Sequence, residues 1–112
     1  MKIEAYSFGS IIIDGKKYST DILIVGDKII NWWRDQGHYL QSQDLKEVWD
    51  YEPDVLVVGQ GAYGTMDVSE DVEKKCAQMG VEFISGKTAD ITDKYNDISD
   101  DKKVACGLHL TC

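Results

Sequence analysis

The sequence predicts an α/β domain in which helices cover a mixed β-sheet. Three observations predict this fold class. The first third of the chain is rich in β-branched residues and two-residue turn signals, which is typical of antiparallel strands. Further along, the apolar residues take up helical spacing. Between the helical segments lie short runs that are apolar on both faces, such as residues 55–58, which indicate buried parallel strands.

The opening third is predicted to be a β-meander. Residues 3–13 alternate well enough to form one strand, and Asp14-Gly15 then supplies a tight hairpin turn. A return strand runs from about residue 16 to residue 25, a second turn follows at Gly26-Asp27, and residues 28–33 form a third strand. All three strands are expected to be antiparallel neighbours.

Two helices are expected in the middle of the chain. The first has apolar residues at helical spacing after Asp44, which together with Glu47 has the spacing of a capping box, and it ends before Pro53. The second begins at Asp67 or Ser69 and ends at a glycine, residue 80. Residues 81–85 follow as another strand.

A third helix and a final strand complete the predicted domain. The helix turns Ile91, Tyr95 and Ile98 inward. The strand, residues 104–110, places its even-numbered residues on one face and its odd-numbered residues on the other. Its small residues, Ala105 and Gly107, are expected to let a helix pack close to the sheet.

Composition bounds the function. The chain has 112 residues, which predicts one domain over residues 1–112, and a formal net charge of −8. Without a basic cluster, neither nucleic acid nor an anionic membrane is an expected partner. There is no apolar run of about 18 residues and no signal-peptide pattern. Three cysteines without framework spacing favour a reducing cytoplasm.

A glycine motif follows the strand at residues 55–58. Gly59-Gln60-Gly61 continues to Gly64 as a formal G-x-G-x-x-G, the pattern with which dinucleotide sites bring a pyrophosphate to a helix N-terminus. Here the next helix begins several residues late, and the next strand ends without an acid for a ribose. A plain glycine-rich turn is therefore the favoured interpretation.

A second glycine-bearing segment, Gly86-Lys87-Thr88, follows the next predicted strand. It resembles the end of a P-loop, but the residues before it are needed as strand. Both glycine segments leave the carboxyl ends of strands and are expected at one edge of the sheet, where Lys87 and the helix start would form an anion pocket. The alternative is a solvated Lys87 and a helix cap at Thr88.

The cysteines and histidines do not predict a metal site. Cys106-x-x-His109-x-x-Cys112 would place Cys106 and His109 on opposite faces of a strand. A catalytic Cys112–His109 pair is not favoured, because side chains this close together on one extended strand do not readily come within hydrogen-bond distance. Cys112 could be a free reactive thiol. No complete catalytic constellation is found, so we assign no catalytic residue, metal or cofactor.

Residues typical of interfaces are concentrated in one segment, Trp32-Trp33-Arg34 followed by His38-Tyr39. Alternation should bury one tryptophan and turn the other away. An uncovered second ring would be a contact residue, with Arg34 and Tyr39 beside it; the alternative is one tryptophan in each of two buried faces.

Several segments together resemble the small Mth938-like domain family of unknown function, whose eukaryotic relatives include an adipogenesis-associated protein and mitochondrial complex I assembly factor three. They are Phe8-Gly9, the strand at residues 18–24 with Asp21-Ile22, residues 53–61, Thr88-Ala89, Tyr95-Asn96 and residues 108–112. The resemblance spans essentially the whole chain. It implies a three-layer α/β fold, with a central mixed sheet, helices and an N-terminal β-hairpin layer, and it implies no established activity.

The same resemblance implies four pocket residues, Gly59, Gly61, Thr88 and Asn96. Gln60 stands where the family often has a small residue or threonine, so a ligand preference tied to that position does not carry over. With Lys87, these residues are the candidate ligand site.

Two functions are therefore predicted. The first is a non-enzymatic protein-binding or assembly module, acting by partner contact or self-association. The second is a binder of a small anionic ligand, or an enzyme, at the edge between the Gly59–Gly64 loop and Lys87. The absence of a catalytic constellation favours the first.

Overall fold

The computed structural model describes residues 1–98 and 100–112. A mixed sheet of five strands forms its centre, in the order β5-β4-β10-β7-β9. These strands are β4 (Ile22–Val25), β5 (Lys28–Asn31), β7 (Val55–Gln60), β9 (Glu82–Gly86) and β10 (Val104–His109). The middle strand, β10, runs parallel to β7 and antiparallel to β4. The prediction of a mixed sheet is confirmed.

The N-terminal strands form a separate antiparallel sheet of three strands, β1 (Ile3–Ser7), β2 (Ser10–Ile13) and β3 (Lys16–Tyr18). The prediction of one strand over residues 3–13 is wrong, because the chain reverses at Phe8-Gly9, where Gly9 has a φ of +82°. The expected return strand over residues 16–25 is also divided. Between Tyr18 and Ile22 the chain leaves the small sheet and enters the central one.

The helices begin and end close to the predicted residues. They are η1 (Ser42–Leu45, a 3₁₀ turn), α1 (Lys46–Tyr51), α2 (Glu70–Met79) and α3 (Thr88–Asp97). Ser69 is the N-cap residue of α2, and Gly80 ends it in the left-handed conformation. The predicted Asp44–Glu47 capping box is not formed. The Asp44 carboxylate instead accepts hydrogen bonds from the backbone N–H groups of Asp35 and Gln41.

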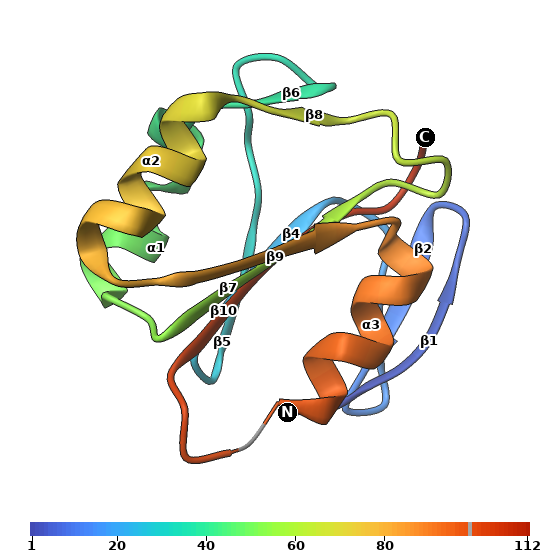
Figure 1. Cartoon of the computed structure of the whole chain (residues 1–112). Helices are drawn as coiled ribbons and strands as arrows, with labels where there is room; N and C mark the ends of the chain where they lie inside the picture. Colours follow the sequence, from blue (N-terminus) through green and yellow to red (C-terminus); the bar gives the residue numbers. More distant parts are fainter. Residues whose placement is uncertain (99) are drawn as a thin grey trace.

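The sheet lies between two layers (Figure 1). One face is covered by α1 and α2, and the other by α3 and the small sheet. Alternate residues of β10 enter the two cores: Cys106 and Leu108 pack toward α3, and Ala105 packs toward α1 and α2. The three layers and the alternation of the last strand agree with the prediction. A short parallel pair, β6 (Tyr39–Leu40) and β8 (Asp67–Val68), lies next to the N-terminal end of α2.

The small residue Gly107 makes room for a tryptophan and not for a helix. A Cβ atom on Gly107 would lie 2.6 Å from Cη2 of Trp32. Strand β5 ends at Asn31, two residues before the predicted end. Trp32 thereby packs against the centre of the sheet, where its Nε1 donates a 2.9 Å hydrogen bond to the carbonyl of Asp44.

Within residues 1–98 and 100–112, none of the helices is long and apolar enough to cross a membrane.

Candidate functional site

Two strand ends meet at the junction between the small and central sheets. In the antiparallel pair of β4 and β10, Ile22 faces Leu108. One step further along each strand, Asp21 therefore lies opposite His109. The sequence identified both residues separately but gave no indication of this contact, because it depends on β4 pairing with a strand more than 80 residues away.

The Asp21 carboxylate makes three hydrogen-bond contacts. Oδ2 lies 2.7 Å from both Nδ1 of His109 and Nη2 of Arg34, and Oδ1 accepts a 2.8 Å bond from the backbone N–H of Leu110. Burial acts to raise the pKa of Asp21, but the hydrogen bonds from His109, Leu110 and Arg34 outweigh it and lower the pKa to about 2. The carboxylate is therefore ionised at neutral pH.

This contact determines the tautomer of His109. An ionised carboxylate can only accept, so Nδ1 must carry the proton it shares with Asp21. Nδ1 then has no lone pair for Nη2 of Arg34, which lies 3.2 Å away. In the neutral ring the lone pair is on Nε2, which is buried and has no hydrogen-bond partner among the described residues. His109 itself is 4% exposed.

Arg34 is an internal residue. Its side chain is 4% exposed, its guanidinium lies 4.6 Å from the ring centre of Trp32, and Nη2 donates a 2.9 Å bond to the carbonyl of Gly37. The prediction placed Arg34 on a contact surface. The structure uses its Nη2 to join Asp21 to the segment after β5, so the guanidinium acts inside the fold.

The two neighbouring tryptophans differ as the alternation predicts. Trp32 is 6% exposed, whereas Trp33 is 88% exposed. Beside Trp33 lies a cavity of about 320 Å³, lined by Thr20, Asp21, Asn31, Trp32, Trp33, Arg34 and Gly37. Asn31 is the last residue of β5, which is an edge strand. Tyr39, also predicted as a contact residue, is 39% exposed.

Strand β7 runs to Gln60, two residues beyond the predicted end, so Gly59 is a strand residue and Gly61 begins the loop. Both glycines are packed against protein. A Cβ atom on Gly59 would lie 2.8 Å from Oγ1 of Thr88, and one on Gly61 would lie 2.5 Å from the carbonyl oxygen of Cys112. These glycines therefore allow α3 and the end of the chain to approach the loop. The Gln60 side chain donates a 2.7 Å bond to the carbonyl of Met66, within the same loop.

Thr88 and Lys87 lie next to this loop, as predicted, and differ in environment. The buried Thr88 hydroxyl donates to the carbonyl of His109 at 2.6 Å and accepts from the N–H of Gly61 at 2.9 Å. The N–H of Thr88 donates to the carbonyl of Gly61 at 3.1 Å. Lys87 is exposed. Thus the hydroxyl and the N–H of Thr88 are occupied by protein groups, and Lys87 remains the exposed cation at this edge.

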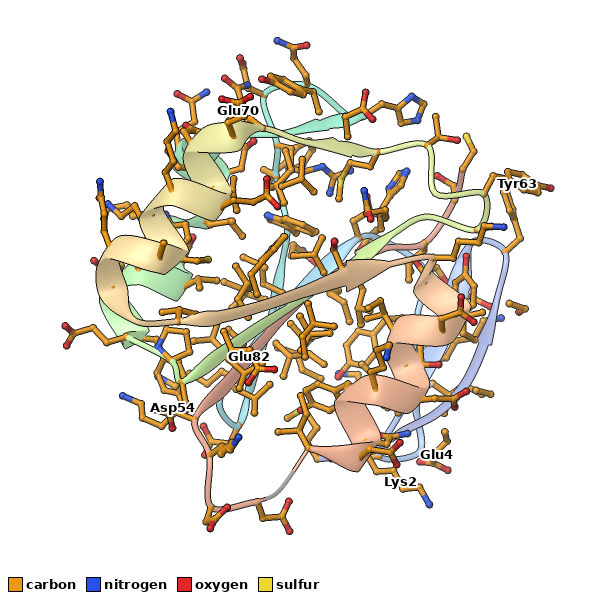
Figure 2. All side chains as sticks on the ribbon, in the orientation of Figure 1. Lys2, Glu4, Asp54, Tyr63, Glu70 and Glu82 are labelled. Carbon is orange, nitrogen blue, oxygen red and sulfur yellow. The ribbon has the colours of Figure 1, made fainter. Side chains whose placement is uncertain are left out.

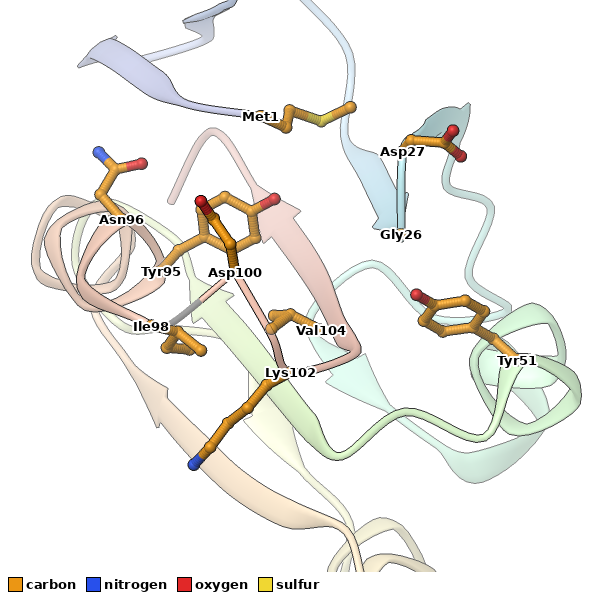
Figure 3. A pocket seen from close by; sticks show the side chains of 10 residues that line it. All are labelled: Met1, Gly26, Asp27, Tyr51, Tyr95, Asn96, Ile98, Asp100, Lys102 and Val104. Atoms are coloured by element: carbon orange, nitrogen blue, oxygen red, sulfur yellow. The ribbon is translucent and has the colours of Figure 1, made fainter.

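Asn96 does not join the other candidate ligand residues. It lies eight residues after Thr88 on α3, about 12 Å along the helix. Its side-chain amide pairs with the backbone N–H and carbonyl of Ile3 at 3.0 and 2.7 Å. It borders a cavity of about 390 Å³ at the start of β10, where Tyr51 and Tyr95 face the opening from two different helices (Figure 3).

The three cysteines are free and occupy different environments. Burial raises the pKa of the Cys76 thiol to about 11, with a smaller contribution from the charge of Glu73, and it raises the pKa of Cys106 further. Cys112 is half-buried, and its Sγ lies 3.8 Å from Nε2 of His38. Among the described residues, no group of three or more His, Cys, Asp or Glu side chains is arranged to hold a metal ion.

A family model described as a protein of unknown function (DUF498/DUF598) matches residues 3–109. The chain belongs to the DUF498/DUF598 family. Among curated proteins, none matches this DUF498/DUF598 chain significantly.

Solved structures support the same assignment. A conserved hypothetical protein from Pyrococcus horikoshii OT3 is 28% identical, with both chains covered completely and a TM-score of 0.91. A structure named MT938 is 22% identical, with 99% and 98% of the two chains covered and a TM-score of 0.83. An Mth938-like domain from Bordetella pertussis is 15% identical, with 97% and 85% covered and a TM-score of 0.70. The resemblance to Mth938-like domains is confirmed.

Proposed function

We propose that this DUF498/DUF598 domain is a protein-binding module. Its contact region, named here the Trp33 surface, consists of the Trp33 side chain, the cavity beside it and the outer edge of β5. One observation carries the proposal: Trp33 is 88% exposed next to a cavity of about 320 Å³, although its neighbour Trp32 is buried. Tryptophan is enriched at the energetic centres of protein interfaces.

The exposed ring stands on a rigid support. Trp32 is held by its hydrogen bond to the carbonyl of Asp44 and by the guanidinium of Arg34 stacked on its ring. Arg34 in turn is tied to Asp21 and Gly37. Because the residues on both sides of Trp33 are fixed, the backbone of this segment loses little conformational entropy when a partner covers the ring.

The strand next to the ring offers backbone groups for pairing. β5 is the last strand of the central sheet and pairs with β4. The outer N–H and C=O groups of such an edge strand can accept an extended segment of another protein. A side chain of that segment would reach the cavity that Asn31, Trp32 and Trp33 line. This supports an extended segment as the occupant.

Charge defines the partner further. The domain has a formal net charge of −8, and Asp35 is exposed two residues after Trp33. A segment with an apolar side chain for the cavity and Lys or Arg residues beside it complements this surface. The expected partner is therefore a protein with an extended, basic and partly apolar segment.

Site-specific crosslinking tests this function. Trp33 is replaced by a benzophenone-bearing phenylalanine, and the protein is irradiated in extract from the source organism; Tyr63, which projects from the loop after β7 (Figure 2) and is 71% exposed, gives the matched control position. The crosslinked segment is identified by mass spectrometry and synthesised. Its Kd is then measured for the wild type, Trp33→Ala and Tyr63→Ala.

The proposal predicts an extended basic segment that crosslinks from position 33, and a Kd that Trp33→Ala raises by tenfold or more, the effect of losing about 1.4 kcal/mol. Tyr63→Ala should leave that Kd within twofold. Equal crosslinking at positions 33 and 63, or equal binding by the Trp33→Ala protein, would contradict the proposal. A crosslink to a second copy of this chain would replace the extended partner by self-association.

The anionic-ligand alternative has less support. The Thr88 hydroxyl and N–H are bonded to protein, and the glycine loop is filled by Thr88 and Cys112. Lys87 offers an exposed cation there. If a ligand does bind at this edge, the stabilisation it gives should disappear in Lys87→Ala.

A further inference from the structure

The loop after β7 holds Cys112 in place. The N–H of Ala62 donates to the carbonyl of Thr111 at 2.7 Å, and the N–H of Thr65 donates to the carbonyl of Cys112 at 3.2 Å. That carbonyl is also packed so closely on Gly61 that a Cβ there would lie within 2.5 Å. The backbone at residues 111 and 112 is thus held by two hydrogen bonds to this loop, and the Cys112 thiol beside it is half-buried.

An imidazole lies against this thiol. Nε2 of His38 is 3.8 Å from Sγ of Cys112, within the range of a hydrogen bond that involves sulfur. The carbonyl of His38 accepts a 2.9 Å bond from the N–H of Asp67, which ties His38 to β8. Two segments that are 74 residues apart in sequence therefore bring a nucleophile and a base together.

A second histidine, His109, lies beside His38. The rings of His38 and His109 meet edge to face, 5.5 Å between centres. Cδ2 of His109 lies 2.8 Å from the Cβ position of Gly61 that the Cys112 carbonyl also approaches. Cδ2 of His109 therefore lies near the Cys112 carbonyl, and Nε2, the neighbouring ring atom, is buried and has no hydrogen-bond partner among the described residues. The pair of Cys112 and His38 has a buried acceptor beside it.

We propose that Cys112 is the nucleophile of a thiol–disulfide exchange site for small, neutral or cationic disulfides. Sγ of Cys112 attacks one sulfur of the disulfide R–S–S–R and forms a new S–S bond, while the bond between the two R–S groups breaks. The thiol proton passes to Nε2 of His38 and then to the departing sulfur, which leaves as R–SH. Cys112 is thereby oxidised to a mixed disulfide, and half of the small disulfide is reduced.

The neighbouring groups determine the substrate class. The thiol is half-buried between the loop after β7 and His38, which admits a small disulfide more readily than one within a folded protein. The domain carries a net charge of −8, so a cationic disulfide approaches faster than an anionic one. Cys76 and Cys106 are buried and are expected not to react in the folded protein.

The test follows the reaction of the folded protein with cystamine at pH 7 by intact mass. One mixed disulfide is expected, located on Cys112 by peptide mapping and absent in Cys112→Ser. The rate of reaction at Cys112 should exceed the rate at Cys112 in the same chain unfolded in urea. His38→Gln should slow the folded protein roughly tenfold, because a positioned base assists removal of the thiol proton. In urea, His38→Gln and the wild type should react equally.

Several results would overturn the assignment. One is a reaction of Cys112 that is no faster in the folded protein than in the unfolded chain. Another is an unchanged rate in a His38→Gln protein whose circular dichroism matches the wild type. The third is modification of Cys76 in place of Cys112. Trp33→Ala should react like the wild type. The experiments on the exchange site therefore test it separately from the proposed protein-binding function.

Discussion

Oδ2 of Asp21 lies 2.7 Å from Nδ1 of His109, at the point where the chain passes from the small sheet to the central one. The same carboxylate binds Arg34 and the N–H of Leu110. It thereby connects the start of β4, the segment after β5 and the end of β10. Because Arg34 stacks on Trp32, the Asp21 carboxylate also supports the residues that flank Trp33.

Asp21→Asn should destabilise the fold strongly. It removes the charge opposite a guanidinium that is 4% exposed, and the loss of one partner of such a pair leaves the other buried and uncompensated. We expect the free energy of unfolding in urea at pH 7 to fall by about 3 kcal/mol. Asp93→Asn, an exposed aspartate on α3, is the control and should change it by less than about 0.5 kcal/mol. Similar losses in the two variants would refute this role of Asp21.

Asp21 should also determine part of the acid sensitivity. Its pKa is lowered from 3.8 to about 2 in the folded protein, so the ionised form stabilises the fold fully above the unfolded pKa, and this contribution disappears as the pH falls through about 2. The shift corresponds to about 2 kcal/mol. Between pH 5 and pH 2, the unfolding free energy of the wild type should therefore fall more steeply than that of Asp21→Asn. Parallel curves would show that Asp21 does not titrate in this way.

Gly107→Ala should damage the contact between β10 and Trp32. The added methyl group would lie 2.6 Å from Cη2 of the buried indole, which must then shift in a packed core. We expect a loss of about 1–3 kcal/mol in thermal or urea unfolding. Gly37→Ala is the matched control, because nothing lies within 4 Å of a Cβ there. If both variants are equally stable, the indole does not occupy this space.

Thr88→Val should weaken the link between α3, the glycine loop and β10. Valine has nearly the same shape but removes the hydroxyl that bonds the carbonyl of His109 and the N–H of Gly61, both of them buried. The expected loss of unfolding free energy is about 2 kcal/mol. Thr65→Val, at an exposed position of the same loop, should be nearly neutral. If Thr88→Val leaves the unfolding free energy unchanged, the hydroxyl of the wild type does not hold these elements together. It would then be available to a ligand, as the anion-pocket hypothesis requires.

The two tryptophans should separate stability from binding. Trp32→Ala removes a buried ring and should cost about 3–5 kcal/mol in unfolding free energy. Trp33→Ala removes a ring that is 88% exposed and should change stability by less than about 0.5 kcal/mol. The emission of Trp33 is the part of the wild-type fluorescence that is missing in Trp33→Ala. Acrylamide should quench this part more strongly than the emission that remains. A large loss of stability in Trp33→Ala would mean that its ring belongs to the core.

Much of the fold could be predicted because local signals agreed with it. The apolar run at residues 55–58 is typical of a buried strand, and Ser69 and Gly80 are residue types that commonly stand at helix ends. The reversal at Phe8-Gly9 was missed because the alternation of residues 3–13 continues through it. Only the left-handed φ of Gly9 distinguishes the turn from a strand, and glycine is compatible with both.

The site was harder to predict than the fold. Alternation, a local property, predicted that Trp32 and Trp33 point in opposite directions, but it did not say which ring is exposed. The contacts of Asp21, Arg34 and His109 follow from strand pairing over 88 residues, for which a single sequence contains no register information. The glycines at residues 59 and 61 were equally compatible with a bound ligand and with close packing of other protein segments, here Thr88 and Cys112. The position of Cys112 beside His38 likewise depends on two distant loops.

Hydrogen–deuterium exchange of the complex tests the central claim, that the Trp33 surface binds an extended segment, most directly. On addition of the segment identified by crosslinking, the amides of β5 (Lys28–Asn31) should exchange several-fold more slowly, because the new strand pairs with their outer edge. The amides of β9 (Glu82–Gly86), at the opposite edge of the sheet, should be unchanged. Protection of β9, or of the loop that carries Tyr63, with none at β5 would contradict the account.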